Sequence, residues 1–150
     1  LQMKTVYILN GPNLNLLGTR EPEIYGKTTL ADVEKMCAQA CSQAGLALAF
    51  SQSNHEGVLL DTLHEIARAV PSGSVAGVIL NAGAYTHTSI ALHDALKALP
   101  CYKIELHISN TFAREGFRHH SYLSAAVNAV MAGLGVGGYA LAIQAIAEQA

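Results

Sequence analysis

The sequence contains few charged residues. Lys, Arg, Asp and Glu together make up 13% of 150 residues, about half of the usual share of ~25%, whereas hydrophobic residues make up 51%. A soluble monomer normally covers its surface with more charge, so the deficit predicts that part of the surface is buried in a homo-oligomer. The net charge is −2 with nine basic residues, which argues against a basic stripe for nucleic acid or for an anionic membrane.

Long hydrophobic runs are also absent, and cysteines are few. Every apolar run is shorter than the roughly 20 residues of a transmembrane helix, and the N-terminus lacks the basic-then-apolar pattern of a signal peptide. Cys37, Cys41 and Cys101 cannot all pair with one another, and Cys37 and Cys41 are expected as small apolar core positions of a helix. Reduced thiols without a targeting signal predict a cytoplasmic protein.

Segments typical of strands alternate with segments typical of helices. Strands are expected at residues 5–10, 46–53, 75–81, 102–108 and 127–132, and helices at 29–44, 57–70, 88–99 and 139–148. The helix boundaries are marked by a capping-box variant, Thr29 with Asp32, and by Gly45, Pro71 and Pro100. This alternation predicts an α/β fold, a flavodoxin-like three-layer sandwich with a five-stranded parallel sheet in the order 2-1-3-4-5, in one catalytic domain spanning residues 1–150.

Some motifs resemble binding signatures but lack their context. Residues 133–138, GLGVGG, fit the dinucleotide pattern G-x-G-x-x-G, yet only 12 residues follow, and a Rossmann unit needs a further strand and an acidic residue about 20 positions on. Close packing of a strand against the last helix accounts for these glycines. The seven histidines do not fall at a metal-ligand spacing, and no lysine has an obvious desolvating niche. Neither a metal, another cofactor nor a Schiff base is therefore expected.

Unusual polar residues cluster where the strands are expected to end. They are Asn10 and Asn13 after the first strand, Asn81 after the third, and His107 and Ser109 at the end of the fourth. Open α/β sheets bind ligands beyond the carboxyl ends of their strands, so these residues indicate a site. Helix capping would account for Thr86 or Thr88 in the segment after the third strand, but it leaves Asn81 and His87 unexplained.

The fourth predicted strand carries polar side chains on one face. Lys103, Glu105 and His107 share that face by the alternation of strand side chains, although central parallel strands are usually apolar on both faces. Glu105 can accept a proton from one ring nitrogen of His107 and so fix its tautomer; a solvent-facing edge strand is the alternative. Arg114 and Arg118 are four residues apart, so on a helical turn they would present two guanidinium groups along one side, with a solvated face as the alternative.

The connection after the first strand is unusually long. Residues 14–26, LNLLGTREPEIYG, exceed the about 2 to 6 residues of an ordinary strand-to-helix loop, and Gly18 and Gly26 are candidate hinges. Such a length is typical of a lid or binding loop. Arg20 and Tyr25 would separately be an exposed arginine and a packing tyrosine, but together on a lid they indicate a functional pair.

Four blocks of the sequence resemble those of type II 3-dehydroquinate dehydratases. They are residues 8–26 (ILNGPNLNLLGTREPEIYG), 81–96 (NAGAYTHTSIALHDAL), 105–110 (ELHISN) and 113–124 (AREGFRHHSYLS), in the family's order and spacing. The stretch GLGVGGYALA resembles the start of the family's C-terminal helix, so the resemblance extends nearly end to end. The departures are His93, where arginine is common, and Gly116, which occupies a variable position; neither falls on a catalytic position, although His93 neighbours Asp94.

The resemblance implies an anti elimination that converts 3-dehydroquinate to 3-dehydroshikimate through an enolate, without metal or cofactor, in the shikimate pathway or in quinate breakdown. Tyr25 would be the general base, with Arg20 and Arg114 favouring its tyrosinate form. His107, oriented by Glu105, would be the general acid for the departing hydroxyl.

The remaining implied roles concern substrate binding and assembly. Asn13, with a water, would stabilise the enolate oxygen, and backbone groups of Ile108 and Ser109 with the Ser109 hydroxyl would bind the carboxylate. The ring hydroxyls would be held by three further side chains, Asn81, His87 and Arg118. Asp94 resembles a residue that reaches into a neighbouring subunit's site, and the family assembles trimers into a dodecamer.

The pairing of Tyr25 with Arg20 is energetically reasonable. A free tyrosine has a pKa near ~10, so a tyrosinate at neutral pH needs about 4 kcal/mol of stabilisation. One guanidinium at ~4 Å supplies about that much at an effective dielectric constant near ~20, but not in an open, wet site.

A flavodoxin-like receiver or flavin-binding module is the alternative class. A receiver would show an acidic cluster after the first strand, where this chain has amides. A flavin binder would need a hydroxyl-rich phosphate loop there, and GPNLNLLG is not one.

Overall fold

The computed structural model describes residues 3–19 and 22–150. The strands are β1 (Thr5–Asn10), β2 (Ala47–Gln52), β3 (Val75–Asn81), β4 (Lys103–His107) and β5 (Ala129–Ala132). The helices are α1 (Pro22–Tyr25), α2 (Leu30–Gln43), α3 (Glu56–Ala69), α4 (Ile90–Ala98) and α5 (Gly137–Gln149). The expected strands and long helices are all confirmed. The short helix α1, inside the expected lid loop, was not predicted.

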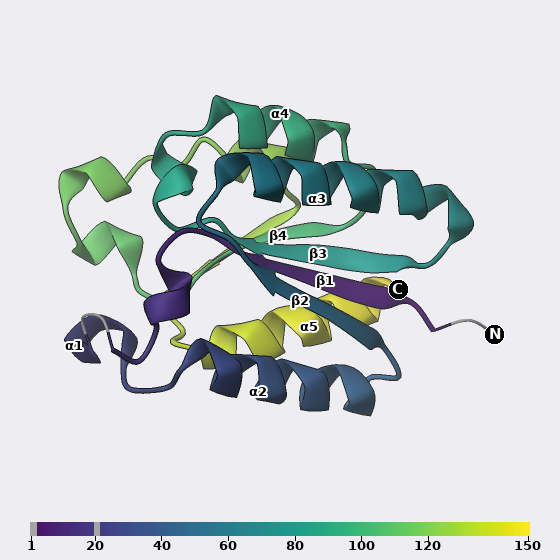
Figure 1. Cartoon of the computed structure of the whole chain (residues 1–150), viewed down its shortest axis with the longest axis horizontal. Coiled ribbons are helices and arrows are strands. Elements are labelled where there is room, and N and C mark those ends of the chain that lie inside the picture. The colour runs from purple at the N-terminus through teal and green to yellow at the C-terminus, as the bar shows by residue number, and fades with distance from the viewer. Residues whose placement is uncertain (1–2, 20–21) are drawn as a thin grey trace.

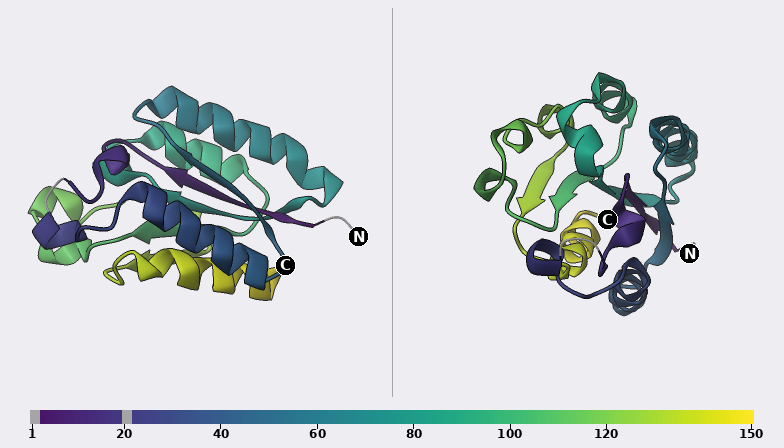
Figure 2. Two further views of the ribbon diagram at one scale, coloured as in Figure 1. Left: turned by 60° about the horizontal axis from the view of Figure 1, so that its bottom comes forward. Right: turned by 60° about the vertical axis from the view of Figure 1, so that its left-hand side comes forward.

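The five strands form one parallel sheet in the order β2-β1-β3-β4-β5. Helices α3 and α4 cover one face of this sheet, and α2 and α5 cover the other (Figures 1 and 2). Each face has its own apolar cluster, one containing Ile8 and Ile143 and the other containing Leu63 and Leu80. The predicted flavodoxin-like three-layer sandwich is therefore confirmed, and the carboxyl ends of the strands meet at one edge of the sheet.

Helix α2 begins and packs as the sequence predicts. The Thr29 hydroxyl accepts from Asp32 N, and the Asp32 carboxylate accepts from Thr29 N, which completes the capping box. Cys37 and Cys41 are buried and unpaired, so their interpretation as core positions is confirmed. No helix of the described residues is long and apolar enough to cross a membrane.

The start of helix α4 differs from the sequence-based alternative. Its N-cap is Ser89, whose hydroxyl accepts from Leu92 N at 2.9 Å, so capping by Thr86 or Thr88 is wrong. Thr86 is instead buried, and its hydroxyl has no hydrogen-bond partner among the described residues. Three hydroxyl residues stand close together here, and only the extended backbone of Ser89 directs its side chain at the first helical turn.

The glycines after β5 serve packing rather than nucleotide binding. They connect β5 to α5, and a Cβ at Gly138 would lie 3.2 Å from Leu106 Cδ1 in β4. The helix therefore approaches the sheet closely where Gly138 stands, as the sequence predicts.

Strand β4 lies inside the sheet, between β3 and β5. The alternative of a solvent-facing edge strand is therefore wrong. The face that carries Lys103, Glu105 and His107 is covered instead. The Lys103 ammonium donates to the carbonyl oxygens of Leu96 and Leu99, both at 2.7 Å, and so caps the C-terminal end of α4. Glu105 and His107 are left to form a polar site.

Candidate active site

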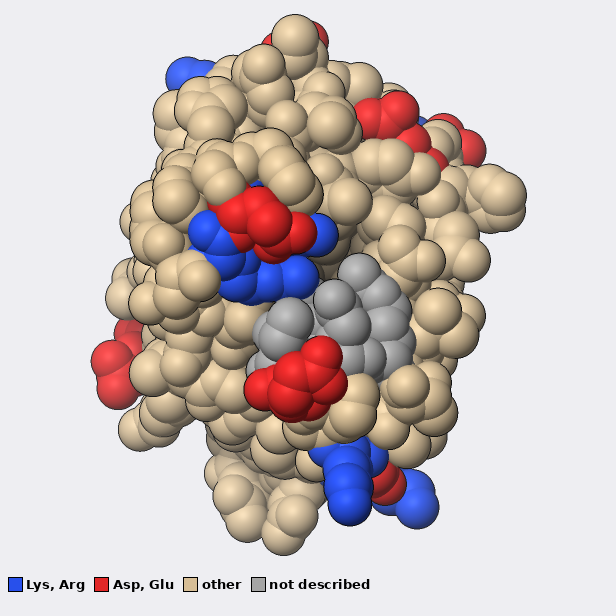
Figure 3. All heavy atoms as spheres, turned by 90° about the vertical axis from the view of Figure 1, so that its left-hand side faces the viewer, with Lys and Arg blue, Asp and Glu red and all other residues tan. Residues whose placement is uncertain are grey.

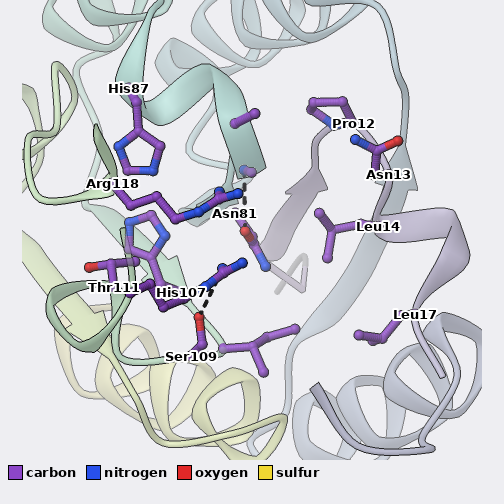
Figure 4. A pocket seen from close by; sticks show the side chains of 14 residues that line it. Pro12, Asn13, Leu14, Leu17, Asn81, His87, His107, Ser109, Thr111 and Arg118 are labelled. Atoms are coloured by element: carbon purple, nitrogen blue, oxygen red, sulfur yellow. Dashed lines mark hydrogen bonds between the residues drawn. The ribbon is translucent and has the colours of Figure 1, made fainter. Parts of the chain in front are cut away.

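A cavity of about 220 Å³ lies at the carboxyl ends of β1, β3 and β4. Figure 4 shows His87, His107 and Arg118 on one side of it and Pro12, Asn13 and Leu17 on the other, with Asn81 between them. Most of the site residues predicted from the sequence line this cavity: Asn13, Asn81, His87, His107, Ile108, Ser109, Arg114 and Arg118. Residues up to 105 positions apart in the chain are thus brought together, as the parallel topology requires.

The loop after β1 is held against the turn after β3. Gly11 N donates to Asn81 O at 2.7 Å, and a Cβ at Gly11 would lie only 2.3 Å from Ala82 O. Asn13 has a left-handed backbone, with φ of 69°, and its N–H donates to Asn54 Oδ1 at 3.0 Å. Asn tolerates this conformation better than most residues. The geometry turns the chain so that Asn13 lines the cavity.

His107 and Glu105 form a buried pair. The His107 Nε2 atom lies 2.5 Å from Glu105 Oε2, and because a carboxylate only accepts, this nitrogen carries the proton. The other ring nitrogen, Nδ1, is then the one that can act on a ligand. The exposed fractions of Glu105 and His107 are 1% and 8%, so the carboxylate is positioned behind the imidazole rather than in the cavity.

Two serines also bind the Glu105 carboxylate. Ser124 Oγ donates to it at 2.7 Å, and Ser121 Oγ lies 3.1 and 3.0 Å from its two oxygens. Burial raises the pKa of Glu105, but the hydrogen bonds from His107, Ser124 and Ser121 outweigh burial and hold that pKa below its usual value. The sequence gives no spacing rule that predicts these serines, since they follow Glu105 by 16 and 19 residues in an irregular segment.

Arg114 directly follows one 3₁₀ turn, Thr111–Ala113, and Arg118 ends the next, Gly116–Arg118; both line the cavity. The expected single helical turn is therefore wrong, although both residues line one cavity as its geometry would require. Arg118 Nε donates to Glu115 Oε1 at 2.9 Å, and Arg114 Nη1 donates to Ser109 Oγ at 3.4 Å. Figure 3 shows a group of basic side chains beside an acidic one on a face that is otherwise mostly uncharged.

His87 and His93 fasten the segment after these turns. His87 Nδ1 donates to His120 O at 2.7 Å, and His93 Nδ1 donates to Tyr122 O at 2.6 Å. Because a carbonyl only accepts, Nδ1 carries the proton in both rings. His87 therefore has Nε2 available to a ligand, and its ring stacks at 6.5 Å from that of His107.

Four predicted site residues are not among those that line the cavity as the described residues form it, and one of them, Glu105, lies behind His107. Arg20 lies outside the described residues, and so does the side chain of Tyr25, whose backbone ends α1 at the cavity end of the sheet (Figure 1). Asp94 is exposed on α4. Within the described part of the chain, no three His, Cys, Asp or Glu side chains are grouped as metal ligands would be.

Comparison with known proteins identifies the family of this chain. Residues 4–147 match the family described as "Dehydroquinase class II". The chain is 64% identical over 145 residues to a protein of Acidovorax ebreus (strain TPSY) named 3-dehydroquinate dehydratase. This match covers 97% of this chain and 98% of that protein.

Two solved structures are similar over almost their whole length. A type II dehydroquinase from Propionibacterium acnes has a TM-score of 0.89 and 40% identity, with 99% of each chain covered. A type II dehydroquinase from Butyrivibrio crossotus DSM 2876 has a TM-score of 0.90 and 39% identity, covering 96% of this chain and 97% of that one. The sequence match and the fold match both extend over nearly the whole chain, which belongs to the class II dehydroquinase family.

Proposed function

We propose that this chain is a 3-dehydroquinate dehydratase of type II, which removes water from 3-dehydroquinate by anti elimination to give 3-dehydroshikimate. The observation that carries the proposal is the buried His107–Glu105 pair, which opens into the same cavity as Asn13 and the two arginines. Such a cavity combines a proton donor, a polar group for an oxyanion and cations for an anionic substrate.

The elimination divides into two proton transfers. In the first, the base removes a proton from the carbon beside the ketone, and the electron pair moves to the ketone oxygen, giving an enolate. In the second, the enolate re-forms the ketone and expels the hydroxyl from the neighbouring carbon, while the acid gives that hydroxyl a proton. One water leaves, and the product has a carbon–carbon double bond conjugated with the ketone.

His107 is the general acid of this proposal. Glu105 accepts from Nε2, so a proton on Nδ1 is directed to the cavity. The hydrogen bonds to the buried carboxylate hold the pKa of Glu105 below its usual value, so the ionised carboxylate keeps Nε2 of His107 as its donor. Asn13 stabilises the enolate oxygen together with a bound water in this proposal, which is supported by its position across the cavity from His107 (Figure 4).

Tyr25 is the general base, and Arg20 and Arg114 favour its ionised form. What supports these roles is the family resemblance of the loop together with the position of Arg114 in the cavity. The loop, about residues 14–26, acts as a lid in this proposal. Closure of the lid excludes water, and this strengthens the attraction between a guanidinium and a tyrosinate.

The substrate carboxylate binds at the start of the segment after β4, to Ser109 and the backbone of Ile108. Asn81, His87 and Arg118 hold the ring hydroxyls. All of these residues line the cavity, and His87 presents an unbonded Nε2 among the described residues because its Nδ1 is engaged by a carbonyl.

The activity can be tested directly. Mixing the protein with 3-dehydroquinate should produce the ultraviolet absorbance of a conjugated enone, and His107→Ala should remove that signal. Absence of the absorbance from the wild-type protein, with substrate confirmed by a second dehydratase, would refute the proposal.

We also propose that the protein works as a homo-oligomer, a dodecamer built from trimers. The deficit of charge supports this, as do large apolar side chains left exposed in the single chain, among them Phe112 and Phe117, whose exposed fractions are 69% and 67%. Strand β5 is also an edge of the sheet. Sedimentation at micromolar concentration should show a large assembly, and a 15.8 kDa monomer would contradict it.

A further inference from the structure

A chain of buried polar side chains runs from the cavity to helix α5. Asn81, which lines the cavity, donates from Nδ2 to the Tyr139 hydroxyl at 2.9 Å. That hydroxyl donates to Asn10 Oδ1 at 2.6 Å, and Asn10 Nδ2 donates to Ser51 O at 3.0 Å. Asn10 and Tyr139 are 0% exposed and Asn81 is 4% exposed, so water does not compete for these hydrogen bonds.

The register of the sheet explains how the two amides meet one tyrosine. Asn10 and Asn81 are opposite each other at the ends of β1 and β3, so their side chains point to the same face. Ile8 and Ile79, two residues earlier, belong to the apolar cluster on the α5 face. On this face, each of the two strands is apolar until its last residue, which is an asparagine. The hydroxyl of Tyr139 lies between the two asparagine amides.

The carbonyl oxygen of Ser51, at one end of this hydrogen-bond network, fixes the direction of every hydrogen bond in the network. A backbone carbonyl only accepts, so Ser51 O requires the amide nitrogen of Asn10 and turns Asn10 Oδ1 toward Tyr139. The Tyr139 proton must then go to that oxygen, and the hydroxyl can accept only from the nitrogen of Asn81. Burial raises the pKa of Tyr139 well above its usual value, so the proton stays on the hydroxyl.

The amide of Asn81 is thereby held in one of its two orientations. Its nitrogen faces Tyr139, and its Oδ1 faces Gly83 N at 3.4 Å, beside the cavity. One N–H and one oxygen lone pair of Asn81 remain for a ligand, at fixed places. A reversed amide would put a donor where the acceptor stands, and it would meet the wrong partner on Gly83.

We infer that Tyr139 is a positioning residue for substrate binding: its hydroxyl sets the amide orientation that Asn81 presents to the ring hydroxyls of the substrate. This role rests on the proposed function, because Asn81 matters here as a substrate ligand. The tyrosine acts through Asn81 and does not itself line the cavity as the described residues form it.

The test is a set of variants assayed with 3-dehydroquinate. Tyr139→Phe keeps the ring in its apolar site and removes only the hydroxyl. KM should rise about tenfold, the cost of a misplaced hydrogen bond, while kcat stays within about twofold, because the loss is in binding. Asn10→Ala should raise KM in the same direction, since the freed hydroxyl can then donate to Asn81 Oδ1 and allow the reversed amide.

A double-mutant cycle separates positioning from a structural role. In an Asn81→Ala background, Tyr139→Phe should no longer change KM, although it should still lower the melting temperature. Tyr102→Phe is the matched control: Tyr102 packs against the same apolar cluster, and its hydroxyl makes no hydrogen bond with the described residues. It should leave KM unchanged.

The outcomes distinguish this role from the function on which it rests. An unchanged KM in folded Tyr139→Phe, or an equal rise of KM in the Asn81→Ala background, would overturn the role of Tyr139 while the proposed function stands. Absence of turnover by the wild-type protein would overturn both. If Tyr139→Phe does not fold, Asn10→Ala and its cycle with Asn81→Ala decide the question by the same criteria.

Discussion

At the scale of single residues, Glu105 is the buried carboxylate that orients His107, the proposed acid. Its hydrogen-bond partners include His107 on the same strand and the two serines Ser121 and Ser124. Ser121 also accepts from the backbone N–H groups of Leu123 and Ser124, so its removal would disturb the turn. Ser124 is the cleaner position, because the hydrogen bond of its hydroxyl among the described residues goes to Glu105.

Ser124→Ala should raise the pKa of Glu105. That pKa lies below its usual value in the folded protein, so the ionised carboxylate stabilises the fold above the unfolded pKa, and this contribution is lost as the pH falls through the folded pKa. Removal of one donor should lower the free energy of unfolding at neutral pH by about 1 kcal/mol. The acidic limb of the kcat/KM profile should move to higher pH, because an active His107 needs the carboxylate.

One control for this prediction keeps a hydroxyl at position 124, and the other removes a hydroxyl elsewhere. Ser124→Thr should retain most of the wild-type profile. Ser72→Ala removes a hydroxyl that donates to Ala69 O far from the site, and it should leave the profile unchanged. Other charged groups near the pair are Arg114 and Arg118 in the cavity, and all variants retain them. A folded Ser124→Ala enzyme with an unmoved acidic limb would contradict the role given to this serine.

Tyr25→Phe separates the base from binding. The ring remains while the ionisable group is lost, so kcat should fall by about 10² to 10⁴, and the dissociation constant for substrate should change little. Stopped-flow or calorimetric binding with a parallel turnover assay measures both quantities. Near-normal kcat in this variant would remove Tyr25 from the mechanism.

At the scale of elements, the cavity depends on the contact between the ends of β1 and β3. Gly11 is the tightest point, because an added Cβ would meet Ala82 O at 2.3 Å and Ala82 C at 2.6 Å. Both atoms belong to the backbone and cannot move aside as a flexible side chain would. The absence of a side chain at Gly11 therefore lets the two loops that line the cavity approach each other closely.

Gly11→Ala should destabilise the protein by about 3 kcal/mol, as overpacking against an unyielding neighbour does, and it should impair turnover as well. Gly57→Ala, in α3, is the matched control, because a Cβ there meets nothing within 4 Å. Alanine has a higher helix propensity than glycine, so this variant should be as stable as wild type or more so. Denaturant unfolding of both variants compares the two; equal stability would show that the contact at Gly11 can relax.

The sequence predicts elements well where a repeating pattern marks them. Alternation marks the polar face of β4, so the pairing of Glu105 with His107 could be predicted and is confirmed. Irregular segments give no such pattern. The two 3₁₀ turns, one just before Arg114 and one ending at Arg118, could not be distinguished from one helical turn, because a spacing of four residues fits a helix and does not exclude two turns.

Contacts between distant segments are the part that sequence does not specify. Ser121 and Ser124 bind Glu105 only because the chain returns over β4, and Tyr139 meets Asn10 across 129 positions of sequence. Asn10 and Asn81 could be placed at the strand ends in advance, and the register that sets them opposite each other is a property of the assembled sheet. The predicted N-cap of α4 was wrong for a local reason, because the choice among three neighbouring hydroxyl residues depends on their backbone angles.

At the scale of the whole molecule, the low charge has a structural counterpart on the surface. The face in Figure 3 is mostly uncharged, with its charged side chains in small groups. Large apolar side chains outside the core include Ile90 on α4, with 60% of its surface exposed. Asp94 is on the same helix and is exposed. If subunits associate there, Asp94 of one chain can enter the site of the next, as the family resemblance implies.

Mixed oligomers test this arrangement. Asp94→Ala and His107→Ala chains should each lose activity, the first because its neighbour's site lacks a carboxylate and the second because its own site lacks the acid. In an oligomer assembled from both, some sites combine the intact His107 of one chain with the intact Asp94 of another. Random mixing at equal amounts should restore activity at about a quarter of the sites, the product of two independent halves.

The variants are mixed by co-expression or by joint refolding, so that both kinds of subunit assemble together. Recovery of activity should depend on assembly, so mixing the two variants without refolding provides the baseline. A mixture of His107→Ala with Glu105→Gln is the matched control. Each site takes His107 and Glu105 from one and the same chain, so every chain of this mixture has a defective site that no combination of subunits repairs. If the Asp94 mixture recovers no more activity than this control, Asp94 acts within its own chain or not at all, and the oligomer would have to serve stability alone.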